Sequence, residues 1–98
     1  MATEVIFNEV TAGSTSDDIV ISQDEGIVVF FASGLAGSET IPIEQEVNGN
    51  YEPIVEAGAA IVLDVDNTNQ GCRGPAVVRL VKPTTAGAVS VVRRTRNP

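Results

Sequence analysis

The chain has 98 residues, 43% of them hydrophobic, and thirteen acidic residues against six basic ones give a formal net charge of −7. This length suits one domain with one modest core, and it leaves no room for a second module. With no histidine and a single cysteine, Cys72, the chain has neither an intrachain disulfide nor the usual zinc hydrolase, Ser-His or Cys-His sites.

Three strands are predicted in the first third of the chain. Residues 4–10 form the first, and the polar stretch 11–17 ends it. Residues 18–22 alternate polar and apolar side chains, which predicts a second strand, and residues 23–26 supply a tight turn. Residues 27–33 are apolar on both faces, which indicates a central strand covered on each side.

The fourth predicted strand spans residues 39–47. It places Ile41, Ile43 and Val47 on one face and acidic side chains on the other. Pro42 removes one backbone donor, so we expect this strand to lie at a sheet edge or to be bulged there.

A hairpin and a further strand follow. Residues 48–50, Asn-Gly-Asn, tolerate positive φ angles and predict a tight hairpin turn, with residues 51–56 as the returning strand. Residues 59–66 predict the next strand, whose apolar face is expected to carry Ile61, Leu63 and Val65.

The last third of the chain predicts a loop over residues 67–75, a strand over 76–82, a turn over 83–87 and a final strand over 88–95. About eight short strands, with no long helical periodicity, indicate an all-β fold of the β-sandwich or jelly-roll type, with a barrel as the alternative. We expect residues 1–98 to form a single β-sandwich domain with short extended termini. With no Trp and few aromatics, its core must be aliphatic, and Cys72 should be a partly buried small apolar residue.

No motif for chemistry stands out. Asp64 and Asp66 lie two residues apart on one strand face, where a carboxylate-only hydrolase site is conceivable, but a solvated strand face explains the same alternation. The oxygen-rich stretch from Asp64 fails the EF-hand spacing, because its sixth and twelfth positions are Asn69 and Pro75, which leaves an irregular calcium site as the alternative. We therefore expect no catalytic residue, no metal and no cofactor.

Charge is divided sharply along the chain. The first 66 residues carry all thirteen acidic residues, and the remaining 32 carry all six basic ones. Either cationic final strands pair with acidic earlier strands of the same subunit, or the basic end meets an acidic neighbour. Few aromatics and an acidic balance argue against a nucleic-acid partner. We also expect no membrane partner, because no secretory signal and no apolar run of about 18 residues is present.

A resemblance to a known family spans about residues 28–92. It rests on the runs GLAGSET at residues 34–40 and KPTTAGAV at residues 82–89, separated by a hairpin and an Asn-containing loop. These runs resemble small β proteins encoded among the structural genes of tailed bacteriophages. The family often enters its penultimate strand with Gly-Thr-Tyr-Arg, where this chain has Gly-Pro-Ala-Val-Val-Arg at residues 74–79.

The resemblance implies a non-enzymatic virion accessory protein that decorates or cements a capsid. We expect a protein made in the host cytoplasm that binds the outer capsid surface as a homodimer or homotrimer and bridges neighbouring capsomers. Its partners would be the major capsid protein and other copies of itself. The expected contact residues are Ile6, Phe7, Arg79, Lys82, Arg93, Arg94 and Arg96.

The extended ends, residues 2–7 and 92–98, are expected to reach onto adjacent subunits, so that removing residues 93–98 would weaken shell binding without affecting folding. The alternative is a carbohydrate- or receptor-binding sandwich on a phage tail. Sugar platforms usually need stacked aromatic rings, and Tyr51 is the one Tyr or Trp in the chain.

Overall fold

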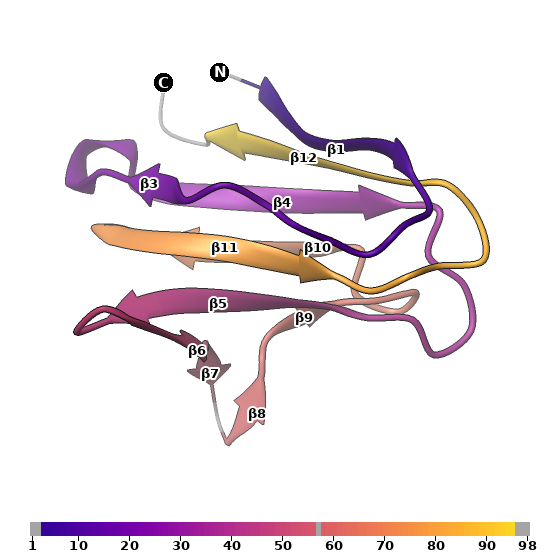
Figure 1. Cartoon of the computed structure of the whole chain (residues 1–98). Coiled ribbons are helices and arrows are strands. Elements are labelled where there is room, and N and C mark those ends of the chain that lie inside the picture. Colours follow the sequence, from indigo (N-terminus) through magenta and orange to yellow (C-terminus); the bar gives the residue numbers. More distant parts are fainter. Residues whose placement is uncertain (1–2, 57, 96–98) are drawn as a thin grey trace.

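The computed structural model describes residues 3–56 and 58–95, and this part contains twelve β-strands, one short 3-10 helix and no α-helix (Figure 1). The all-β class is therefore confirmed, with antiparallel strands in two main sheets that are consistent with a β-sandwich. Nothing in the described residues amounts to a helix that could cross a bilayer.

Four strands form the first sheet, called sheet A. Its order is β1 (Thr3–Val10), β12 (Val89–Thr95), β4 (Ile27–Ser33) and β10 (Asn69–Arg73). All neighbours are antiparallel, and β12 lies between β1 and β4 with Arg93 opposite both Glu4 and Phe30. The first and last strands of the chain are thus side by side (Figure 1).

Six strands form the second sheet, called sheet B. Its central pair is β11 (Ala76–Lys82) and β5 (Ile41–Val47). On the far side of β11 lie β2 (Ser14–Thr15) and β3 (Ile19–Ile21), and on the far side of β5 lie β6 (Asn50–Pro53) and β9 (Val62–Leu63). A separate ribbon joins β7 (Val55–Glu56) to β8 (Ala59–Ala60), and the 3-10 helix η1 spans Gln23–Glu25.

The core lies between the two sheets. Alternate residues of each strand point inward, so that β4 buries Val28, Phe30 and Ala32 while β5 buries Ile41 and Ile43. Burial of each Val, Ile or Phe side chain contributes about 1.5–3 kcal/mol. The core is mainly aliphatic, as expected, with two phenylalanines, and it consists of Phe7, Ile19, Ile21, Val28, Phe30, Ala32, Ile41, Ile43, Ile61, Leu63, Cys72, Val78, Leu80, Val89 and Val91.

Residues 39–47 were expected to lie at an edge or to be bulged at Pro42. The edge position is wrong, because β5 pairs on both sides, and the ladders of β5 show no register shift at Pro42. The amide and carbonyl of Ile43 bond to Ile61 and Ile54, on the β9 and β6 side. Neighbouring backbone groups alternate in direction, so the missing donor of Pro42 faces β11, where the β5–β11 ladder has already ended at Ile43. A proline is thus accommodated inside the sheet at the end of one ladder.

Two further boundaries differ from the sequence prediction. The expected loop 67–75 contains strand β10, which forms because five consecutive residues pair in register with β4, although Asn, Gln and Gly are poor strand formers. The expected strand 59–66 is split into β8 and β9, with Ile61 between them bonded to both Ile54 and Ile43. The hairpin over residues 48–50 is confirmed, with φ angles of 52° at Asn48 and 85° at Gly49.

Candidate interaction surfaces

The outward face of sheet A is apolar at its centre. In β4 the inward residues are buried, whereas Ile27, Val29 and Phe31 on the other face are half-buried and keep part of their surface exposed. Across the register Phe31 lies beside Val92, and Val92 lies beside Val5, which is 58% exposed. The sequence predicts that both faces of residues 27–33 are covered. Within this chain the inward face of β4 is buried, whereas the outward face keeps part of its surface exposed.

Two arginines accompany this apolar centre. Arg94 is exposed, and its guanidinium carbon lies 5.2 Å from the centre of the Phe31 ring, which is cation–π distance. Arg73 is exposed on β10, opposite Ile27. The register places Val5, Ile27, Val29, Phe31, Ser33, Asn69, Gly71, Arg73, Ser90, Val92 and Arg94 on the outward face of sheet A. In the irregular part of β1, the exposed Glu9 lies at one end of this face, where its amide donates to Oγ of Ser90 at 2.9 Å.

The outward face of sheet B has the opposite charge. At its centre the Arg79 Nε donates to Oε1 of Glu44 at 2.9 Å, and the guanidinium of Arg79 lies 3.8 Å from the centre of the Tyr51 ring. The Tyr51 hydroxyl donates to the carboxylate of Asp18, and this hydrogen bond raises the pKa of Tyr51 above its usual value of 10.0. One polar network thereby joins β5, β6, β11 and the loop before β3.

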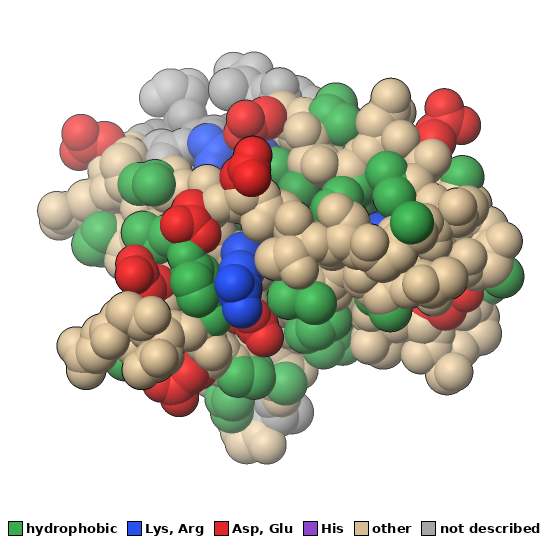
Figure 2. Space-filling view, in the orientation of Figure 1, with side chains coloured by type: hydrophobic (Ala, Val, Ile, Leu, Met, Phe, Trp, Pro, Cys, Tyr) green, Lys and Arg blue, Asp and Glu red, His purple; other side chains and the backbone are tan. Residues whose placement is uncertain are grey.

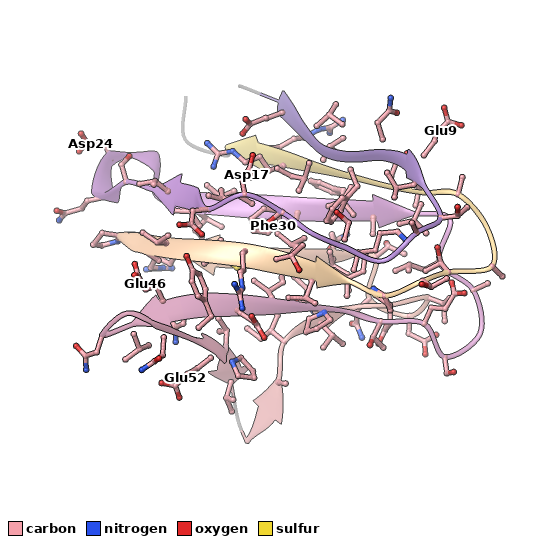
Figure 3. All side chains as sticks on the ribbon, viewed as in Figure 1. Glu9, Asp17, Asp24, Phe30, Glu46 and Glu52 are labelled. Carbon is pink, nitrogen blue, oxygen red and sulfur yellow. The ribbon has the colours of Figure 1, made fainter. Side chains whose placement is uncertain are left out.

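Acidic side chains outnumber basic ones on this face. By register and contact it carries Asp18, Glu44, Glu46, Tyr51 and Arg79, together with the apolar Val20, which is 63% exposed. Figure 2 shows acidic side chains gathered over β3, β5 and β6 around a basic group. The labelled Glu46 and Glu52 both belong to the β5–β6 hairpin (Figure 3).

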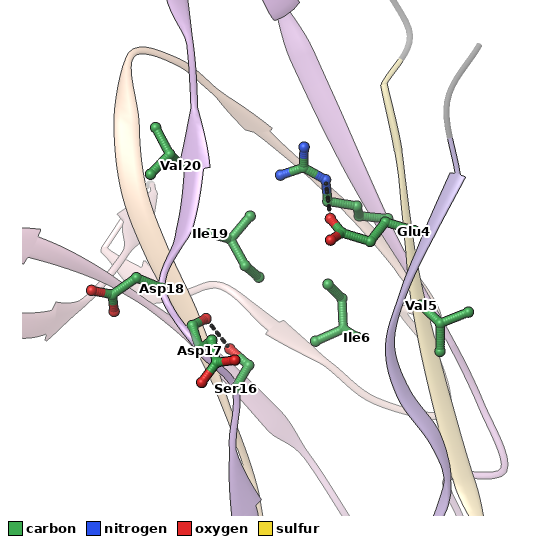
Figure 4. A pocket seen from close by; sticks show the side chains of 9 residues that line it. Glu4, Val5, Ile6, Ser16, Asp17, Asp18, Ile19 and Val20 are labelled. Atoms are coloured by element: carbon green, nitrogen blue, oxygen red, sulfur yellow. Dashed lines mark hydrogen bonds and ion pairs between the residues drawn. The ribbon is translucent and has the colours of Figure 1, made fainter.

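A groove lies between the edge of sheet A at β1 and the edge of sheet B at β2 and β3. It has a volume of about 330 Å³, with Ile6 and Ile19 facing each other across it (Figure 4). The Arg93 Nε lies 3.1 Å from Oε1 of Glu4 at one wall, and Asp17 lies at the other. Both edges are poor templates for an added strand, because β1 has a register shift between Val5 and Phe7 and β3 is only three residues long.

The expected contact residues are spread over several places rather than brought together. Arg94 lies on the outward face of sheet A, Arg79 lies on that of sheet B, and Ile6 and Arg93 line the groove. Arg96 lies outside the described residues. Sequence reasoning did not single out the outward side chains of β4, although the apolar pattern of both its faces was the available signal.

Two of the expected contact residues cannot serve as surface contacts in this structure. Phe7 is 5% exposed and belongs to the core. Lys82 is 2% exposed, and its ammonium donates to the carbonyls of Ala12 at 3.0 Å and Pro83 at 2.9 Å and to Oγ1 of Thr85 at 3.1 Å. These three acceptors match the three donors of an ammonium, which makes its burial tolerable.

The two runs that carry the family resemblance meet in one cluster of loops. Glu39, in the run at residues 34–40, accepts the amide of Ala36 at 2.9 Å and the amide of Ala86, in the run at residues 82–89, at 2.8 Å. These bonds, the Ala86 one first, hold the pKa of Glu39 below its usual value of 4.5. Gly34 has a φ of 96°, and a Cβ there would lie 2.2 Å from the carbonyl oxygen of Ala88, so the contact requires glycine. Both runs therefore have a structural role.

Of the two carboxylates singled out in the sequence, Asp64 and Asp66, Asp64 has a structural role in its own loop. Asp64 Oδ1 accepts the amides of Asp66 at 3.0 Å and Asn67 at 2.7 Å, which closes the loop before β10. In the described part of the chain no group of three or more His, Cys, Asp or Glu residues is placed to hold a metal ion. Comparison with protein-family models, with curated proteins and with solved structures finds no match.

Proposed function

We propose that this chain is a non-enzymatic structural protein of a phage virion, one that binds the outer capsid surface as a decoration or cement protein and bridges neighbouring capsomers. The observation that carries the proposal is the outward face of sheet A. It presents Val29, Phe31 and Val92 beside two exposed arginines, and a small sandwich gains from covering such a face with another protein.

The composition of this face supports a protein partner. Contact surfaces between proteins are enriched in aromatic residues and arginine and depleted in acidic residues at their centres. Phe31 under Arg94 matches this description, and its neighbours in the register, Val92 and Asn69, carry no charge. The resemblance of the runs at residues 34–40 and 82–89 to phage structural proteins adds the virion as the setting.

The carbohydrate-binding alternative gains no support from Tyr51. One face of its ring is occupied by the guanidinium of Arg79, 3.8 Å from the ring centre, and its hydroxyl is bonded to Asp18. A stacking platform for a sugar needs an open aromatic face.

The proposal is tested by counting copies of this chain per particle. Particles are purified by density from the lysate of a phage that encodes the chain, and the chain is quantified by mass spectrometry against the major capsid protein. Hundreds of copies in a fixed ratio to the capsid protein are expected. A handful of copies would move the chain to the tail, and none would overturn the structural role.

A further inference from the structure

We propose that the outward face of sheet A packs against the outward face of sheet B in a second copy of this chain. The contact is head-to-tail, since two different faces meet. It makes a second copy, rather than the capsid, the protein that covers the outward face of sheet A, and it concerns self-association of the isolated chain, so it can be tested apart from the capsid role.

Sheet A supplies an apolar centre with positive charge. Val29, Phe31 and Val92 form the centre, and Arg73 and Arg94 add two positive charges beside it, while the one carboxylate near this face, Glu9, lies at the far end beside Ser90. Covering this surface removes apolar area from water, which stabilises a complex, and leaves the arginines in need of acidic partners.

Sheet B supplies those acidic partners. Its outward face carries the carboxylates of Asp18, Glu44 and Glu46 against the single guanidinium of Arg79. Glu44 already binds Arg79, and Asp18 accepts the Tyr51 hydroxyl, whereas Glu46 is exposed at the edge of the network. The exposed Val20 provides apolar surface on the same face. Opposite charges and apolar area are therefore present on the two faces together.

Contacts between like faces are disfavoured by the same charges. Two copies joined through sheet A would bring the Arg73 and Arg94 side chains of both together, and two joined through sheet B would bring together their carboxylates. Like-charge contact at an interface is strongly unfavourable. A head-to-tail contact avoids this cost, and by symmetry it generates a closed ring or an open filament rather than a two-fold dimer.

The experiment compares four forms of the full chain by analytical ultracentrifugation over a concentration series at low salt. The first is the wild type, and the second reverses the sheet A charges with Arg73→Glu and Arg94→Glu. The third is Glu46→Lys on sheet B. The fourth, Glu52→Lys, is the matched control, since Glu52 lies in the same hairpin but projects from the opposite face of β6.

The wild type and Glu52→Lys should associate alike, whereas the sheet A and Glu46→Lys variants should each weaken association by about tenfold or more. An equimolar mixture of these two defective variants should recover a heterodimer, because each supplies the face that the other lacks. Unfolding midpoints should stay unchanged, since all four substituted side chains are exposed.

Several results would overturn the inference. If Glu46→Lys associates like the wild type, sheet B is not the partner of sheet A. If the wild type remains monomeric at millimolar concentration, the outward face of sheet A does not bind a second copy. Loss of the sheet A variant from particles would then identify the capsid as the partner of this face. Copy number on particles is measured separately, so failure of this contact and failure of the virion role are distinguishable.

Discussion

At the scale of single residues, the loop cluster at one end of the sandwich depends on Glu39. Its two carboxylate oxygens accept one amide from its own loop and one from the loop before β12. A glutamine at this position keeps one acceptor oxygen and replaces the other with a donor, so it cannot accept both amides.

The Glu39→Gln variant should therefore be less stable than the wild type at neutral pH. Because the folded-state pKa of Glu39 lies below 4.5, its contribution is present above pH 4.5 and is lost as the pH falls through the lowered pKa. Urea unfolding of both proteins at neutral and acid pH is the measurement, and the difference between them should shrink below pH 4.5. A difference that stays constant across this range would show that the ionised carboxylate does not provide the stabilisation.

Lys82 is the second residue on which this cluster depends. Replacing it with Met should lower the free energy of unfolding by about 1–3 kcal/mol, because the carbonyls of Ala12 and Pro83 lose their hydrogen-bond donor in a buried place. Urea unfolding measures the change. As an independent check, this single lysine should resist amine acylation in the folded protein and react in urea. Ready acylation of the folded protein would contradict the burial of Lys82.

At the scale of elements, the cationic end of the chain belongs to an interior strand. Residues 93–95 of β12 pair with β4 on one side, and Arg93 and Arg94 pair with β1 on the other. This pairing argues against the expectation that removal of residues 93–98 would leave folding unaffected, since the deletion removes backbone pairing on two edges.

A chain ending at Thr95 should unfold at nearly the wild-type urea concentration, whereas one ending at Val92 should lose at least about 2 kcal/mol, given about 0.5–1.5 kcal/mol per backbone hydrogen bond. Equal stability of the two truncated chains, measured by urea unfolding, would mean that the end of β12 adds nothing to sheet A.

Strands with a strong local strand preference were predictable, and those defined by pairing were not. The prediction for residues 27–33 matches β4 because five consecutive β-branched or aromatic residues, 27–31, have a strong strand preference. The sequence of β10 resembles a loop, and only its register with β4 makes it a strand. Pro42 was placed at an edge because a sequence does not show at which residue a neighbouring ladder ends.

At the scale of the whole molecule, the division of charge along the sequence becomes a division between faces. Part of the basic charge pairs within the chain, as Arg79 with Glu44 and Arg93 with Glu4 show. Arg73 and Arg94 instead remain exposed on the outward face of sheet A, and acidic residues dominate that of sheet B. Some basic residues thus fit pairing within the subunit, and others fit contact with an acidic neighbour, which are the two alternatives drawn from the charge pattern.

The candidate surfaces were only partly predictable from the sequence. Arg94 and Arg79 were expected at contacts and lie exposed or half-exposed on the two faces. Phe31 was not singled out, because a run apolar on both faces does not tell which side the chain itself covers. Lys82 was misplaced, because a lysine is usually exposed and its three acceptors come from segments far apart in the sequence or from the following turn.

We propose that the outward face of sheet A is exposed in the isolated chain and covered by another protein in the assembled particle. Carbene footprinting tests it by comparing residues 27–31 in the dilute isolated chain and on purified particles, since the inward residues Val28 and Phe30 are buried in both. Labelling of Val29 and Phe31 should fall sharply on particles, while Glu52 labels equally in both. Equal labelling of Val29 and Phe31 in the two samples would contradict the account.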